Sequence, residues 1–343
     1  MTFKKVAVIT VAGAVLLAGA ITLSMSLTAR NKMEIEVAET PINTEADAAE
    51  EGTKTLENME NMPLYFEDTD TLLLPLRNTM EGLGGSVTWN AETKMTEVSY
   101  RDRVLQVQSG EKDAILNGYE ITLPEAVQMI NGCLYAEEAV ISAYYTGDVD
   151  FNHEAGRVTL QMKDGTEPVV AVKKIMADRE NGGYALDVPV IVGLNDTNYE
   201  KSLNESLMQE MQAYAADFMA AEEQDDQKEH LLQLELKTGL CSKDFLSIRW
   251  EGEQGGSAVS FAKNIDLLGQ KTVTLADMLT KDTLQAVQKQ AGEGWSADRF
   301  YLNEDGGLVL LRGSQENSLE SYSWTAEDRQ LIWKEKFGEL FGK

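Results

Sequence analysis

Histidine is nearly absent from this chain, whose 343 residues include only His153 and His230. A catalytic zinc ion needs about three protein ligands, so two histidines far apart in the sequence do not form such a site. Cysteine is equally scarce. Cys133 and Cys241 both lie far from the N-terminal apolar run, which excludes a lipid-modified N-terminal cysteine. We expect two buried thiols, with a single disulfide as the alternative.

Basic residues are also few, because 30 Lys and Arg stand against 57 Asp and Glu, a formal net charge of −27. Such a chain repels phosphate backbones and anionic lipid surfaces, so we expect no nucleic-acid partner. The charge would attract a cationic protein, or it would simply keep an exposed protein soluble. Hydrophobic residues make up 43% of the chain, which is enough for folded cores.

The longest apolar run lies at the N-terminus. Lys4 and Lys5 precede the uncharged residues 6–29, and this run exceeds the roughly 20 residues that span a bilayer as a helix. We predict a single transmembrane anchor at residues 6–29, with residues 1–5 as a cytoplasmic stub and the rest of the chain outside the plasma membrane. The alternative is a signal peptide cleaved after Ala20 or Ser26, which would release a secreted protein.

Residues 30–62 are rich in acidic residues and poor in large apolar ones. Such a stretch buries too little apolar surface to offset the entropy of ordering it, and its charges repel one another. We therefore predict an extended, flexible tether.

Residues 63–165 contain an internal repeat, since residues 85–92 recur in altered form at residues 147–154. Each copy follows a short amphipathic helix, at residues 76–83 and 137–145, and precedes an alternating strand. Between the copies, Asn117-Gly118 indicates a tight hairpin. The pattern predicts a twisted antiparallel sheet packed on one or two short helices.

The first copy resembles a known family. Residues 74–77, 80–85 and 87–90, with the motif around Asn117-Gly118, are similar to the copper amine oxidase N-terminal, or stalk, domain. The second copy departs from the pattern at residues 134–137. The resemblance implies an accessory module of exported bacterial proteins that holds no copper.

Residues 168–343 predict a second α+β module. Strands are expected at residues 169–175 and 185–192, followed by a long helix that begins at a capping box formed by Thr197 and Glu200. Two alternating strands then carry leucines at positions 232, 234 and 236 and apolar residues at 246, 248 and 250, with Gly239 in the turn between them. A further helix is expected at residues 275–291. The predicted fold class is thus α+β, with two mainly antiparallel, helix-packed modules after one transmembrane helix.

Short motifs of this second half, at residues 188–194, 246–248, 265–279 and 300–308, resemble the extracytoplasmic module of anti-sigma-V-type lysozyme receptors and certain peptidoglycan deacetylases. The resemblance implies a lysozyme-like protein or peptidoglycan as ligand. Ser257 departs from the pattern, because it follows paired glycines where the family has an Ala-His type sequence.

Motifs that carry chemistry are isolated or incomplete. Residues 198–200 resemble a topaquinone-forming triplet, but the copper of such enzymes needs three histidines. Residues 260–263 match a Ser-x-x-Lys pattern inside an expected strand. Residues 148–152 imitate the start of a calcium loop, but the required glycine is replaced by His153. We expect no catalytic residue, no cofactor and no metal site.

The sequence therefore favours an envelope-facing recognition or scaffold protein that binds a cationic, lysozyme-like protein or peptidoglycan. The candidate ligand-binding residues are Glu253, Gly255, Gly256 and Ser257, with the neighbouring Trp250, for which core packing is the other explanation. The alternative function is a cell-envelope hydrolase that uses carboxylates outside any recognised motif.

Overall fold

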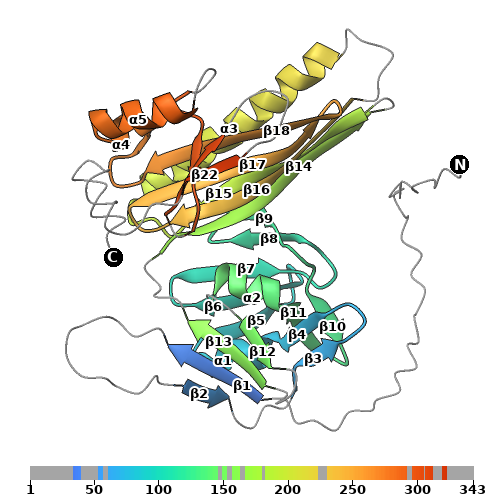
Figure 1. Ribbon diagram of the computed structural model, residues 1–343. Coiled ribbons are helices and arrows are strands. Elements are labelled where there is room, and N and C mark those ends of the chain that lie inside the picture. Colours follow the sequence, from blue (N-terminus) through green and yellow to red (C-terminus); the bar gives the residue numbers. More distant parts are fainter. Residues whose placement is uncertain are drawn as a thin grey trace, which may run out of the picture. The chain divides into compact units, whose positions relative to one another are not determined.

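The computed structural model describes residues 34–39, 53–56, 61–145, 149–152, 157–162, 167–179, 182–222, 230–291, 296–304, 306–311 and 319–322. All of them belong to one compact unit, Met33–Lys343. The fold is α+β, mostly sheet with few helices (Figure 1). None of the helices in these ranges combines the length and apolar character needed to cross a bilayer. The expected anchor at residues 6–29 lies outside the described residues.

The first part of the fold contains three sheets with two short helices. Two sheets are antiparallel, with the orders β10-β11-β4-β3 and β5-β6-β7-β8-β9, and the third has the order β12-β13-β1-β2. The elements are β3 (Leu64–Phe66), β4 (Thr71–Pro75), α1 (Leu76–Gly82), β5 (Ser86–Asn90), β6 (Met95–Tyr100), β7 (Arg103–Val107), β8 (Asp113–Leu116), β9 (Tyr119–Thr122), β10 (Gln128–Ile130), β11 (Cys133–Glu137) and α2 (Glu138–Tyr144). The predicted hairpin joins β8 to β9, because Asn117 and Gly118 adopt the positive φ angles that a two-residue turn needs.

The strand register follows the internal repeat. In the first copy Val87 of β5 pairs with Val98 of β6. In the second copy Val149 of β12 (Val149–Asn152) pairs with Leu160 of β13 (Arg157–Met162), and each of these residues lies 62 positions after its counterpart.

The two copies are related by a local two-fold axis. Leu74 of β4 pairs with Ala136 of β11, which is its own counterpart in the repeat, and the pairing is antiparallel. Consistent with this axis, α1 contacts β11 and α2 contacts β4. Each copy therefore packs its helix against the strand of the other.

Two strands lie within residues 30–62, where the sequence predicts a flexible tether. β1 (Glu34–Glu39) pairs in parallel with β13, and β2 (Thr53–Leu56) pairs with β1. The structure thus differs from the prediction over these strands. The physical reason is visible in β1, whose first four residues, Glu-Ile-Glu-Val, alternate acidic and apolar side chains with the period of a strand.

The second part of the fold is a six-stranded sheet with the order β14-β15-β16-β17-β18-β19 and a separate three-stranded sheet, β20-β21-β22. The elements are β14 (Val169–Arg179), β15 (Gly182–Val192), α3 (Thr197–Glu222), β16 (His230–Cys241), β17 (Phe245–Gln254), β18 (Ser257–Asp266), β19 (Lys271–Thr272), α4 (Leu275–Met278), α5 (Lys281–Ala291), β20 (Phe300–Leu302), β21 (Leu308–Leu311) and β22 (Leu319–Tyr322).

The helix α3 packs along the six-stranded sheet (Figure 1). As the sequence periodicity predicts, it buries Leu203, Leu207, Met211 and Phe218. They meet the predicted apolar face of the sheet, where Leu232, Leu234, Leu246, Ile248 and Trp250 are buried.

Three local predictions are wrong in detail. The cap of α3 is Asp196, whose Oδ1 accepts from the backbone N–H groups of Asn198 and Tyr199, so Thr197 does not form the capping box. Gly239 lies inside β16 rather than in a turn, and glycine is required there because a Cβ would clash with the carbonyl oxygen of Leu302. The helix expected at residues 275–291 is interrupted between α4 and α5.

Neighbouring residues of β15 are buried in two different hydrophobic cores. Val190 and Val192 belong to the core of the first part, together with Val169 and Ala171 of β14, whereas Ile191 belongs to the core under α3. The boundary predicted at residues 165–168 therefore lies within continuous packing.

Candidate functional site

The loop predicted to bind a ligand is the tip of the β17–β18 hairpin. Gln254 pairs with Ser257, and Gly255 and Gly256 form the turn with φ angles of 55° and 79°. Glu253, Gly255, Gly256 and Ser257 are all exposed. The two glycines are therefore explained by the turn, which requires positive φ at both positions.

Trp250 does not share this exposed tip. Its side chain is only 2% exposed and stacks on Phe261 with ring centroids 5.0 Å apart. It lines a hollow of about 340 Å³ under α3 together with Tyr214 and the ion pair between Lys263 and Glu210. The structure thus separates Trp250 from the four loop residues and places it in the core.

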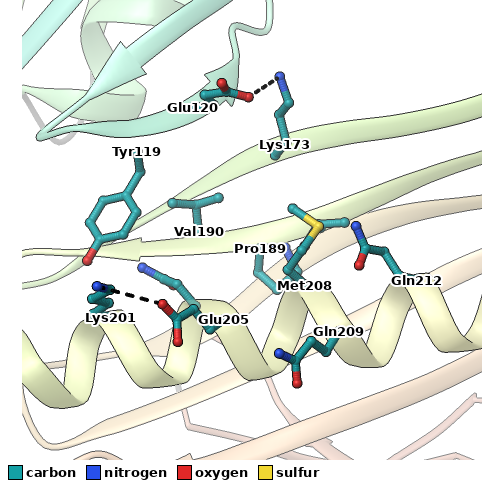
Figure 2. A pocket seen from close by; sticks show the side chains of 12 residues that line it. Tyr119, Glu120, Lys173, Pro189, Val190, Lys201, Glu205, Met208, Gln209 and Gln212 are labelled. Carbon is teal, nitrogen blue, oxygen red and sulfur yellow. Dashed lines mark ion pairs between the residues drawn. The ribbon is translucent and has the colours of Figure 1, made fainter.

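A larger groove, of about 500 Å³, lies between β9, β15 and α3 (Figure 2). Its apolar lining comes from Val188, Pro189 and Val190 of β15 and from Met208 of α3. Tyr119 and Glu120 reach it from β9, and Lys173 reaches it from β14. None of these positions was predicted as a site residue from the sequence.

The groove exists because β16 leaves β15 part-way along the sheet. The parallel pairing of these strands ends at Leu186 and Leu234. Beyond that point, Asp187 accepts at its carboxylate from the Leu236 N–H and at its carbonyl from the Trp250 indole N–H. Pro189 follows, and it has no N–H to offer a neighbouring strand.

Two side chains of α3 replace the missing strand. Asn204 is buried, and its amide pairs with both the N–H and the carbonyl of Ile191, each at 2.8 Å. Glu200 accepts at Oε2 from the N–H groups of Gly193 and Leu194, at 2.7 and 2.8 Å. Because backbone groups in antiparallel strands alternate in direction, the carbonyl of Pro189 points to the same side as that of Ile191, towards the groove.

The charged side chains of the groove are paired with one another. Lys173 contacts Glu120 at 3.5 Å, and Lys201 contacts Glu205 at 3.9 Å (Figure 2). Burial raises the pKa of the Tyr119 hydroxyl, and the charge of Glu200 raises it further. Tyr119 is therefore a neutral hydrogen-bonding group at physiological pH.

This arrangement provides groups that can bind a ligand. The groove offers an apolar floor, a backbone carbonyl and the exposed amides of Gln209 and Gln212. Such a combination matches an extended peptide or a long side chain of a protein ligand. A proline inside a strand was the signal in the sequence that could have located an incomplete sheet edge here.

The described residues also bear on the predictions about the two thiols and about metal sites. Cys133 and Cys241 are both half-buried and form no disulfide with each other. Burial raises the pKa of the Cys133 thiol, an effect that Arg77 partly offsets. In the described ranges, no cluster of three His, Cys, Asp or Glu side chains could hold a metal ion.

Residues 52–192 match the family model of the copper amine oxidase N-terminal domain. The resemblance inferred from the first repeat copy is therefore confirmed. The match ends at residue 192, so the resemblance of the second half to anti-sigma-V-type receptors and deacetylases stays a prediction.

One related protein, from Brevibacillus choshinensis, bears the name "Protease inhibitor". It is 26% identical over 132 residues, which make up 38% of this chain and 40% of that protein. The similarity thus spans less than half of the relative.

Among solved structures, a DUF3298 family member from Bacteroides fragilis covers 58% of this chain and 98% of its own, with 14% identity and a TM-score of 0.34. A DUF3298 protein from Pseudomonas aeruginosa covers 50% of this chain and 96% of its own, with 14% identity and a TM-score of 0.35.

Proposed function

We propose that this chain is an extracytoplasmic recognition or scaffold protein that binds a protein ligand through the groove between β9, β15 and α3. The groove is the observation that carries the proposal. Its floor is apolar, and its lysines and glutamates are paired with each other. Among the described residues, Pro189 pairs with β14 on one side and with no strand on the side of β16. These features form a surface to which a segment of a ligand can bind.

The charge of the chain supports a cationic ligand. A net charge of −27 raises the encounter rate with a basic protein and repels acidic ones. The name of the Brevibacillus relative, "Protease inhibitor", is consistent with a protein ligand. A lysozyme-like protein is the ligand that fits both the charge and the resemblance of the second half, and peptidoglycan is the other ligand that this resemblance implies.

The apolar residues 6–29 would hold the protein at the plasma membrane as a single-pass anchor, with the rest of the chain outside the cell. In this proposal residues 63–165 form the stalk-like module and residues 168–343 the receptor-like module. Cleavage of the leader would give the same protein in secreted form.

The test is retention of lysozyme and of purified cell wall on the immobilised full-length chain, at low and at moderate salt. We expect lysozyme to be retained, with weaker binding at higher salt. Reversing the charge at Glu205 (Glu205→Lys) should weaken binding about ten-fold, because it places a cation in the groove.

The matched control is Asp217→Lys, which makes the same charge change on an exposed position of α3 that does not line the groove. Equal losses in the two variants would show that net charge alone acts and that the groove is not the site. Failure of the wild-type chain to retain either probe would overturn the proposed function.

A further inference from the structure

The two-fold relation between the repeat copies shows which residues occupy equivalent positions in the two copies, including pairs that are not 62 positions apart in the sequence. Tyr65 of β3 pairs with Leu72, and Met129 of β10 pairs with Leu134. Leu134 is the counterpart of Leu72, 62 positions later, so Met129 is the structural counterpart of Tyr65. In the same way, Phe151 of β12 is the counterpart of Trp89 of β5.

The two-fold relation gives two equivalent positions, and one of them is occupied by the packed pair of Tyr65 and Phe151. Tyr65 contacts Phe151 with ring centroids 4.8 Å apart, and both side chains pack against the first core. The same two-fold relation predicts that Met129 lies close to Trp89, in the symmetry-related position.

The equivalent position, formed by Trp89 and Met129, is exposed to solvent. Trp89 is 56% exposed and Met129 is 53% exposed. They are two of the five large apolar side chains that are exposed in the described part of the chain. Burying such a pair against a partner would remove apolar surface from water, which favours association.

We infer that Trp89 and Met129 form a docking surface for a cationic protein, separate from the groove under α3. The inference rests on the proposed function, and it adds a second contact surface for the same class of ligand. A lysine or arginine of the ligand would lie over the Trp89 ring, and its aliphatic stem would contact Met129.

The chemistry of the surface favours this occupant over others. An exposed indole is the aromatic group that best attracts an ammonium or guanidinium group, and a methionine adapts to the shape of an aliphatic stem. Glu92 is exposed in the turn after β5. A second copy of this chain would bring another −27 charges, which opposes self-association.

The experiment measures the affinity of the full-length chain, solubilised in detergent, for lysozyme as the cationic probe. Trp89→Ser and Met129→Ser are each expected to weaken binding at least about five-fold, as centrally placed apolar contacts do. The double variant should lose less than the product of the two single losses, because both side chains would contact the same ligand group.

Two matched controls carry the same change at exposed apolar positions elsewhere. Leu268 is 71% exposed and Met176 is 63% exposed. Leu268→Ser and Met176→Ser should leave the affinity within about two-fold of wild type, as near-neutral surface positions do.

Each outcome has a distinct meaning. Normal binding by the wild type with no loss in the Trp89 and Met129 variants would overturn the docking surface and leave the proposed function intact. Equal losses in all four variants would overturn it as well, because general surface hydrophobicity would then be responsible. Absence of lysozyme binding by the wild type would overturn the docking surface, and it would overturn the proposed function only if purified cell wall were not retained either. Self-association that the Trp89 variant abolishes would assign the surface to a second copy and would overturn the inference.

Discussion

The indole nitrogen of Trp250 donates a hydrogen bond to the carbonyl oxygen of Asp187, 2.8 Å away. Trp250 lies on β17 and Asp187 on β15, with β16 between them in the sheet. The Asp187 carboxylate also accepts from the N–H of Leu236 on β16. Asp187 therefore joins three strands at the point where β15 and β16 separate and the groove begins.

Replacement of Trp250 should affect stability before it affects binding. Trp250→Ala should lower the free energy of unfolding by about 3–5 kcal/mol, because it leaves a cavity in the core under α3. Trp250→Phe keeps most of the ring and should cost about 1 kcal/mol for the lost hydrogen bond. Chemical denaturation of the two variants measures both values. A Trp250→Ala variant as stable as wild type would contradict the buried placement.

The amide of Asn204 should be essential to the groove wall. Asn204→Leu leaves the buried N–H and carbonyl of Ile191 without their partner, which should cost roughly 2–5 kcal/mol. Gln209→Leu, an exposed position on the same helix, is the control and should change stability by no more than about 0.5 kcal/mol. Thermal denaturation that fails to separate these variants would show that Asn204 does not replace a strand.

The cap of α3 should make stability depend on pH in the acid range. The backbone N–H of Tyr199 and the side chain of Gln270 bond the Asp196 carboxylate and hold its pKa below the usual value of 3.8. A group whose pKa is lowered by folding stabilises the fold above its unfolded pKa, and this contribution is lost as the pH falls through the folded pKa. Wild type should therefore be more stable than Asp196→Asn at pH 7.

Asp196→Asn is a clean comparison because asparagine can still cap the helix but does not titrate in this range. The difference in melting temperature between wild type and Asp196→Asn should shrink as the pH falls below about 4. A difference that stays constant down to pH 2 would show that the charge of Asp196 has no part in the cap.

The pairing of β1 with β13 can be tested through its backbone. Val37→Pro removes the N–H of a residue in the middle of β1, and proline is rarely accepted inside a sheet. Hydrogen exchange of the β13 amides should become faster, while Val37→Ile should leave it unchanged. If β13 exchanges at the same rate in both variants, β1 contributes nothing to its protection.

Local patterns predicted most elements of this fold. Alternating apolar residues located the strand after each repeat copy, β6 and β13, and the strands β16 and β17, and Asn117-Gly118 located the β8–β9 turn. The repeat was visible because Gly85 and Gly147 head the same pattern twice. These features depend on neighbours in the sequence, so periodicity and turn chemistry were sufficient.

Features that depend on distant partners were missed. Gly239 was assigned to a turn because a glycine between two strands usually marks one, whereas it is required where Leu302 of β20 crosses β16. β1 was not predicted because its partner strand, β13, lies more than a hundred residues later. Pro189 could have indicated an incomplete sheet edge, but the groove itself could not be predicted, because it depends on where β16 leaves β15.

The antiparallel pairing of Leu74 with Ala136 also bears on how such a chain could have arisen. A strand that pairs with its own counterpart about a two-fold axis is the geometry of a symmetric homodimer interface. A single ancestral copy would have had to associate with a second copy, so that its strand (the equivalent of β4 or β11) was paired and its helix (the equivalent of α1 or α2) was packed against the other copy. Fusion of the two copies would make that interface internal, and it would free each copy to diverge, as the packed Phe151 and the exposed Trp89 have done.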